Sequence, residues 1–358
     1  MYKYINYKQM NIGKYIISRN HKPFIIAEMS GNHNKSLERA LKIVEAVAAS
    51  GAHMLKLQTY TADTLTINSK NSDFFIADKE SLWKGKSLYD LYKEAYTPWE
   101  WHEKIIKRAN ELGLLCFSTP FDETAVDFLE KLNVPAYKIS SYENVHLPLI
   151  KKVAKTGKPV IISTGLASED EIKDAVKALK DGGCKEFALL KCTSSYPASP
   201  ENSNILTIPD LRAKFNCEVG LSDHTIGIGA ALGAISHGAT IIEKHFTLDR
   251  NDGGVDSSFS IEPNDMKILV QESANTWQAL GKVSYGATES EKAGLRFRRS
   301  IYIVEDIKEN EKLTTKNLRI IRPGKGLLPK YYEELLGRTV NQKLKKGTAL
   351  QWEMLSKK

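Results

Sequence analysis

VGLSDH at residues 219–224 and IIEKHF at residues 241–246 are two strand-like apolar runs that each carry a histidine at the carboxyl end. A helix-length segment separates them, which is the strand–helix–strand spacing of a parallel sheet. Because the carboxyl ends of parallel strands meet at one edge, we expect His224 and His245 to emerge side by side. Two imidazoles at one edge are candidates for a metal site.

The same alternation of short apolar runs and longer amphipathic stretches extends from residue 24 to about residue 280. Helices are expected between the runs, for example at residues 36–50 with Ser36 as N-cap and at residues 169–182 with Ser168 as N-cap. Eight strands are predicted, at residues 24–28, 53–58, 114–118, 136–139, 160–163, 187–191, 218–221 and 241–246. This pattern predicts the α/β class and a (β/α)8, or TIM, barrel over residues 1–285.

Three other segments depart from the barrel pattern. Residues 61–98 form a long polar insertion with scattered aromatic residues, which is typical of a lid or a subunit-contact loop. Residues 286–299 are glycine-containing and charged, and we interpret them as a linker. Residues 300–358 predict a small β-rich domain with strands at 301–304 and 318–321, since their proline and glycine content disfavours a helical tail.

Composition narrows the class of protein. A chain of 358 residues with 42% hydrophobic content suits one large barrel with a small appendage. The net charge of +8 is spread over helices, which favours anionic small molecules and argues against nucleic acid as a partner. Cysteines 116, 184, 192 and 217 lack CxxC spacing and predict reduced core residues in a cytoplasmic protein. We expect no membrane span and no signal peptide.

Polar side chains fall at the predicted strand ends, which a TIM barrel would gather at one mouth. Lys56 on an apolar strand predicts a phosphate- and carboxylate-binding pocket, together with the hydroxyls of Thr119, Ser141, Ser194 and Ser222. The two histidines can hold a divalent ion such as Mn²⁺, which would polarise a substrate carbonyl. Glu28 and Glu143 are candidates for proton transfer. The structural alternatives are hydrogen-bonded histidines, a Lys56 that extends to solvent, and a Glu28–Lys56 salt bridge.

Several motifs carry a resemblance to a known family. They are IAEMSGNH at 26–33, KLQT at 56–59, FSTPF at 117–121, YKISS at 137–141, STG at 163–165, LSDHT at 221–225 and EKHFT at 243–247. With these motifs the chain resembles the sialic acid synthase family, whose members condense phosphoenolpyruvate with an amino-sugar aldehyde. RSI at 299–301 and RPGKG at 322–326 resemble the family's antifreeze-like (SAF) domain.

The resemblance implies a role for each candidate residue. His224 and His245 would hold Mn²⁺, with Mg²⁺ or Co²⁺ as alternatives, and Glu28 and Glu143 would handle protons. Phosphoenolpyruvate would be bound by Lys56, Thr119, Ser141, Ser194 and Ser222. The sugar would be bound by Gln58, Tyr196, Asp256 and Arg322, the last from the partner subunit of a domain-swapped homodimer.

Two departures from the neuraminate synthases concern the substrates, the first at the contact to phosphate and the second at the sugar. Ser194 stands where those enzymes have an asparagine, and Val255 stands between Gly254 and Asp256 where they have a proline. The second segment resembles the pseudaminic acid synthases, whose sugar is 2,4-diacetamido-2,4,6-trideoxy-L-altrose. Its methyl group would suit an apolar contact near Val255 or Phe259.

Other functions stay open on the sequence. N-acetylneuraminate or legionaminate synthesis would use the same motifs with another sugar. A metal-dependent aldolase or isomerase on the same barrel would use the histidines, with Lys56 as a Schiff-base lysine. A non-catalytic carbohydrate-binding protein would bind sugar without turnover, and the many polar strand ends argue against it.

Overall fold

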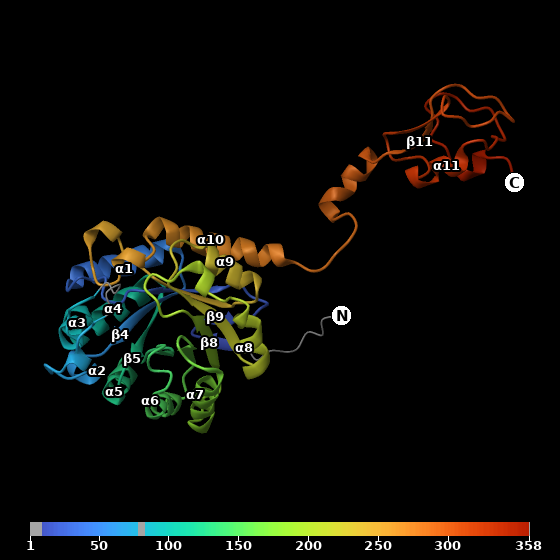
Figure 1. Cartoon of the computed structure of the whole chain (residues 1–358). Helices are drawn as coiled ribbons and strands as arrows, with labels where there is room; N and C mark the ends of the chain where they lie inside the picture. The colour runs from blue at the N-terminus through green and yellow to red at the C-terminus, as the bar shows by residue number, and fades with distance from the viewer. Residues whose placement is uncertain (1–8, 78–82, 358) are drawn as a thin grey trace. The chain divides into compact units, whose positions relative to one another are not determined.

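The computed structural model describes residues 9–77 and 83–357. The chain divides into two compact units, Met1–Gly281 and Lys282–Lys358, and each is considered by itself (Figure 1). The first unit contains the predicted barrel. The predicted linker, residues 286–299, contains the 3₁₀ helix η5 (Glu289–Phe297).

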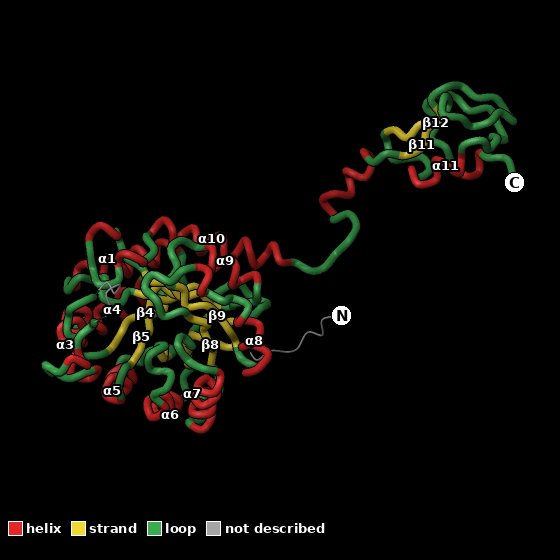
Figure 2. Tube along the Cα trace, in the orientation of Figure 1, coloured by secondary structure: helices red, strands yellow, loops and turns green. Residues whose placement is uncertain are grey.

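The barrel is closed by eight parallel strands of the described chain in the order β10-β3-β4-β5-β6-β7-β8-β9, with helices around them (Figure 2). The strands are β3 (Phe24–Glu28), β4 (Met54–Thr59), β5 (Leu115–Pro120), β6 (Tyr137–Ile139), β7 (Val160–Ser163), β8 (Phe187–Cys192), β9 (Glu218–Asp223) and β10 (Ile241–His245). Each end lies within two residues of the predicted one. The prediction of a TIM barrel is therefore confirmed.

The helical layer follows the predicted capping signals. The Ser36 hydroxyl accepts a hydrogen bond from the Arg39 amide, and Ser168 forms a capping box with Glu171. The helices are α1 (Leu37–Ser50), α4 (Trp99–Glu111), α5 (Glu123–Lys131), α6 (Leu147–Ala154), α7 (Glu169–Asp181), α8 (Thr207–Phe215), α9 (Gly229–Ser236) and α10 (Pro263–Leu280). Short 3₁₀ helices are η2 (Pro200–Asn202), η3 (Arg250–Asp252) and η4 (Ser257–Phe259).

Side-chain alternation divides the barrel strands into two faces. Residues such as Ile25, Leu55 and Ile162 belong to the large apolar core formed with the helices. Residues of the opposite parity form a separate core that includes Ile26 and Met54. The inner face is thus apolar at the amino ends of the strands, and charged residues of the same parity follow toward the carboxyl ends.

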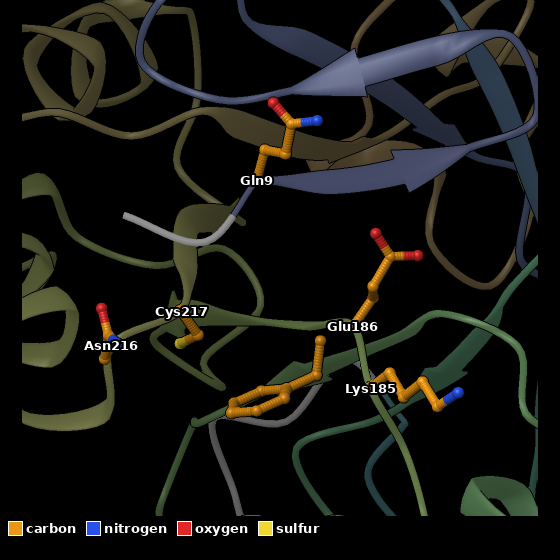
Figure 3. Close-up of a pocket in the computed structure, with 6 residues that line it drawn as sticks. Gln9, Lys185, Glu186, Asn216 and Cys217 are labelled. Carbon is orange, nitrogen blue, oxygen red and sulfur yellow. The ribbon is translucent and has the colours of Figure 1, made fainter. Parts of the chain in front are cut away.

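A hairpin of β1 (Met10–Ile12) and β2 (Tyr15–Ile17) packs against the inner apolar core. Asn11 Nδ2 donates a hydrogen bond of 2.6 Å to Glu186 Oε1, which ties the hairpin to the start of β8. A small cavity lies beside this contact (Figure 3). Its volume of about 10 Å³ is near the lower limit for one water molecule, so it is too small for a ligand.

The insertion after β4 forms short helices. They are α2 (Ala62–Leu65), η1 (Ser72–Phe74) and α3 (Leu88–Ala95). Residues 78–82 of the predicted lid lie outside the described residues. Helices α2 and α3 (Figure 1) contact each other. Several residues of the insertion line the cavity at the mouth of the barrel.

The second unit has its own apolar core, which includes Ile301, Leu318 and Val340. Its elements are the antiparallel strands β11 (Ser300–Ile303) and β12 (Leu318–Ile321), η6 (Pro329–Tyr331), α11 (Tyr332–Leu335) and η7 (Trp352–Met354). Both predicted strands are present. All four cysteines of the chain are buried and free, and none of the described helices is long and apolar enough to span a bilayer.

Candidate active site

A cavity of about 460 Å³ opens at the carboxyl ends of the barrel strands, a size typical of small-molecule sites. Nine of the predicted site residues line it: Lys56, Gln58, Ser141, Glu143, Tyr196, Ser222, His224, His245 and Asp256. Glu28, Thr119 and Ser194 are not among the lining residues, although each contacts or adjoins one of them. Arg322 belongs to the other compact unit.

Lys56 lies in a cluster of buried charges. Its Nζ is 2.7 Å from Glu28 Oε2 and 3.3 Å from Glu243 Oε1, and it donates a hydrogen bond of 3.5 Å to Thr119 Oγ1. Burial alone would lower the pKa of Lys56, but Glu243 and Glu28 outweigh it and raise the pKa above its usual value. The alternative in which Lys56 extends to solvent is wrong. The salt bridge with Glu28 is present, and the raised pKa disfavours Lys56 as a Schiff-base nucleophile.

Lys138 is a second buried cation, which the strand-end reasoning missed. It lines the cavity, donates a hydrogen bond of 2.6 Å to Ser163 Oγ, and lies 3.6 Å from Glu243 Oε1. Burial, with the nearby charge of Lys56, lowers the pKa of Lys138. Its inward parity on β6, shared with Ala136 of the inner core, was the signal that could have identified it.

Glu243 is the carboxylate shared by the two lysines, and it too was missed as a site residue. Burial alone would raise the pKa of Glu243, but Lys138 and Lys56 hold it at about 2. Its Oε2 has no hydrogen-bond partner within the described part of the chain. Glu243 therefore stays ionised between two cations that it does not fully satisfy.

Two predicted hydroxyls, those of Ser141 and Ser194, lie beside Gly165, and that of Ser222 contacts Glu243. Ser141 Oγ accepts a hydrogen bond of 3.1 Å from the Gly165 amide, and Ser222 Oγ donates one of 3.2 Å to Glu243 Oε1. A Cβ atom at position 165 would lie 2.3 Å from Ser194 Oγ and 2.6 Å from Ser141 Oγ, so only glycine fits here. Lys56 and Lys138 line the cavity together with the hydroxyls of Ser141 and Ser222, and this lysine end is suited to phosphate and carboxylate groups.

His224 and His245 come together as predicted, with ring centroids 5.2 Å apart. His224 Nδ1 lies 2.9 Å from the Thr193 carbonyl and must donate to it, which leaves the lone pair on Nε2. Burial opposes protonation of His224, but its contact with Cys192 raises its pKa above the usual value. Proton and metal would therefore compete for this imidazole.

His245 completes the pair. Its buried Nδ1 has no hydrogen-bond partner in the described residues and lies 3.5 Å from Asp256 Oδ2. The described residues contain no group of three or more histidine, cysteine or acidic side chains arranged for a metal. The two imidazoles with nearby carboxylate oxygen nevertheless fit a divalent transition ion that keeps open positions for substrate.

The two predicted catalytic carboxylates differ in setting. Glu28 is fully buried behind Lys56, and its Oε1 accepts hydrogen bonds from the Ser30 amide (2.9 Å) and Gln58 Nε2 (3.2 Å). Glu143 lines the cavity and accepts a hydrogen bond from Ser140 Oγ. Burial raises the pKa of Glu143, which brings it toward the range of a general acid or base.

The predicted sugar residues lie beside the histidines. The rings of Tyr196 and His224 are 4.4 Å apart, and Asp256 accepts a hydrogen bond from Ser30 Oγ. Val255 lines the cavity, whereas Phe259 packs against Tyr196 and is not part of the lining. Of the two residues predicted for an apolar sugar contact, Val255 faces the cavity.

Comparison with known proteins agrees with this geometry. The NeuB family pattern matches residues 43–285, and the SAF domain pattern matches residues 298–356. A pseudaminic acid synthase of Campylobacter jejuni is 42% identical over 95% of this chain and 98% of its own length. Another, of Helicobacter pylori, is 41% identical over 92% and 96%.

A solved structure is also similar, the N-acetylneuraminic acid synthetase of Leptospira borgpetersenii. It is 31% identical, with a TM-score of 0.72 over 81% of this chain and 96% of that one. The inner-face lysines, the paired histidines and these relationships lead to one assignment: the chain belongs to the NeuB family and ends in a SAF domain.

Proposed function

We propose that this chain is a pseudaminic acid synthase, a transferase that condenses phosphoenolpyruvate with 2,4-diacetamido-2,4,6-trideoxy-L-altrose. The observation that carries the proposal is one cavity in which two buried lysines adjoin a pair of histidines. The identity with pseudaminic acid synthases over nearly the whole chain supports this sugar over those of neuraminate and legionaminate synthases.

Phosphoenolpyruvate brings a phosphate and a carboxylate, and the lysine end of the cavity suits both. Lys56 Nζ and Lys138 Nζ lie 3.3 and 3.6 Å from Glu243 Oε1. Each lysine would give up part of this contact to pair with the incoming anion. Ser141, Ser163 and Ser222 would supply hydroxyl donors. We propose the same role for Thr119 and Ser194, which lie next to this lining.

The proposed reaction forms and breaks bonds in a defined order. Carbon three of phosphoenolpyruvate attacks the sugar's aldehyde carbon and forms the new C–C bond. Water adds to the resulting cationic carbon two, and the C–O bond to phosphate breaks. The products are pseudaminic acid and inorganic phosphate.

A divalent cation, Mn²⁺ foremost with Mg²⁺ or Co²⁺ as alternatives, would be held by His224 and His245 and would polarise the sugar's carbonyl group. Asp256, 3.5 Å from His245 Nδ1, would orient that imidazole. Glu143 would take the proton from the attacking water, because it faces the cavity and its pKa is raised. Glu28 would hold Lys56 and Gln58 in place.

We further propose a cytoplasmic homodimer in which Arg322 of one chain contacts sugar bound to the other. Exposed apolar side chains at the barrel mouth support a covered surface: Tyr142, Leu166 and Ile226 follow β6, β7 and β9, and they are 58%, 73% and 55% exposed. Sedimentation of the full chain tests this assembly, since a monomer at assay concentrations would contradict it.

The experiment that tests the function is phosphate release from phosphoenolpyruvate with Mn²⁺, with each of two sugars and with or without chelator. Release that requires the diacetamido altrose and stops with chelator is expected. A preference for N-acetylmannosamine would move the chain to the neuraminate branch. Turnover of sugar without phosphate release would favour the aldolase alternative, and borohydride trapping would then identify its lysine.

A further inference from the structure

One side of the cavity is apolar, in contrast to its lysine end. The lining residues of this side come from the insertion after β4 and from the segment after β10. Its apolar residues are Leu65, Ile76, Trp83, Leu88, Leu91, Ala95 and Val255, and Tyr92 of the same insertion also lines the cavity. Hydroxyl groups of a sugar would find no partners on the aliphatic side chains, whereas methyl groups would be buried favourably.

Trp83 joins the two segments that form this apolar side. Its Nε1 donates a hydrogen bond of 3.1 Å to the Val255 carbonyl oxygen. Its ring centroid is 6.0 Å from that of Tyr196, whose ring lies against His224. The apolar side is thus fixed in position relative to the histidine pair.

Val255 is also held from behind. A Cβ atom at position 31 would lie 2.4 Å from Val255 Cγ2, so the absence of a side chain at Gly31 makes room for the valine. Asp256, the next residue, is buried and lies 3.5 Å from His245 Nδ1. The valine side chain therefore has one defined location in the lining.

The position of the sugar follows by elimination, and this step rests on the proposed function. Phosphoenolpyruvate occupies the lysine end, and the aldehyde carbon lies at His224 and His245. The remaining carbons of the sugar extend from the histidines into the rest of the cavity, and Val255 lines it next to Asp256, which lies 3.5 Å from His245 Nδ1.

We propose that Val255, held by Trp83 and Gly31, is the specificity-determining residue that selects a methyl group at carbon six of the sugar over a hydroxymethyl group. A hydroxyl placed against the valine would lose its hydrogen bonds to water without replacement. The hydrogen bond from Trp83 to the Val255 carbonyl oxygen holds the valine in the position from which it selects the sugar.

The test uses two sugars that differ only at carbon six, 2,4-diacetamido-2,4,6-trideoxy-L-altrose and its analogue with a hydroxyl group on carbon six. Their kcat/KM ratio is measured by phosphate release in wild type and in Val255→Thr, which exchanges a methyl for a hydroxyl of similar size. We expect the preference for the 6-deoxy sugar to fall by roughly tenfold in the variant. Val283→Thr is the matched control, because Val283 is 85% exposed outside the barrel, and its ratio should equal that of wild type.

A ratio in Val255→Thr equal to that of wild type would overturn the inference while the proposed function stands. If wild type releases no phosphate with the diacetamido altrose, both are overturned. If Val255→Thr is inactive with every sugar, Trp83→Phe decides instead. It removes the hydrogen bond to Val255 but keeps an aromatic ring, and an unchanged ratio in it would overturn the inference.

Discussion

Glu243 and Lys244 are neighbours on β10, and they lie on opposite faces of the barrel sheet. Outside, Lys244 Nζ donates to Asp223 Oδ2 at 2.9 Å and to the Thr225 carbonyl at 2.6 Å. Inside, Glu243 stands between Lys56 and Lys138 at 3.3 and 3.6 Å, and one of its oxygens has no hydrogen-bond partner among the described residues. Both clusters are buried, but the carboxylate of the outer one, Asp223, has partners for both oxygens.

The difference separates a structural ion pair from a binding site. The outer pair joins β9 to β10 through short bonds. The inner lysines share one carboxylate at longer distances, so an arriving phosphate or carboxylate can take over part of their coordination. Side-chain parity on one strand thus distinguishes the residues that hold the barrel together from those that act on substrate.

The largest expected effect comes from Lys56→Met. The substitution removes a cation from the proposed anion site and leaves Glu28 and Glu243 without it. We expect kcat/KM for phosphate release to fall about 10⁴-fold, which corresponds to about 5 kcal/mol. A loss of less than tenfold in a variant that melts like wild type would contradict the role of the inner face.

Lys244→Met tests the outer face. Removal of one partner from a buried pair should destabilise the fold by about 3–5 kcal/mol, because Asp223 is left buried without its cation. Urea unfolding measures the change. The rate of phosphate release per folded molecule should equal that of wild type, and a variant with normal stability and lost activity would reverse the assignment of the two faces.

Glu143→Gln tests the proposed role of the Glu143 carboxyl in proton transfer. Because the pKa of Glu143 is raised, its ionised form appears only at higher pH than for an ordinary glutamate. The acid limb of the wild-type kcat/KM profile should therefore lie above the usual glutamate range. The variant should lose about 10²-fold in activity together with that limb.

The same raised pKa has a consequence for stability. Because burial favours the protonated carboxyl of Glu143, protonation adds to the free energy of unfolding. This contribution is complete below the pKa of the group in the unfolded chain, and it is lost as the pH rises through the pKa in the folded chain. Glu143→Gln should therefore be more stable than wild type at neutral pH.

The activity profile of the same variant gives the contrary outcome. If the acid limb of kcat/KM persists in Glu143→Gln, the proton is handled by Glu28 instead.

The barrel could be predicted because parallel strands are buried on both faces and are punctuated by polar residues at their carboxyl ends. The same reasoning brought His224, His245 and Lys56 to one cavity. Lys138 was missed because the candidates at this strand were taken only from the polar residues that follow it, such as Ser141 and Glu143. Counting every second residue along β6 from the inner-core residue Ala136 would have included it.

The insertion could not be predicted in this way. Its residues show no regular period, and their positions depend on contacts with distant segments, such as the hydrogen bond from Trp83 to Val255. Local sequence carries no signal for such a contact. The proposed role of Arg322 likewise rests on resemblance, because no strand of the barrel positions it.

We infer that the inward-facing charges of the barrel bind substrate and that its outward-facing charges stabilise the fold. Calorimetric titration of phosphoenolpyruvate into wild type, Lys138→Met and Lys244→Met tests this division. We predict that Lys244→Met binds as wild type does and that Lys138→Met binds at least about tenfold more weakly. Equal weakening in both variants, or wild-type affinity in Lys138→Met, would contradict it.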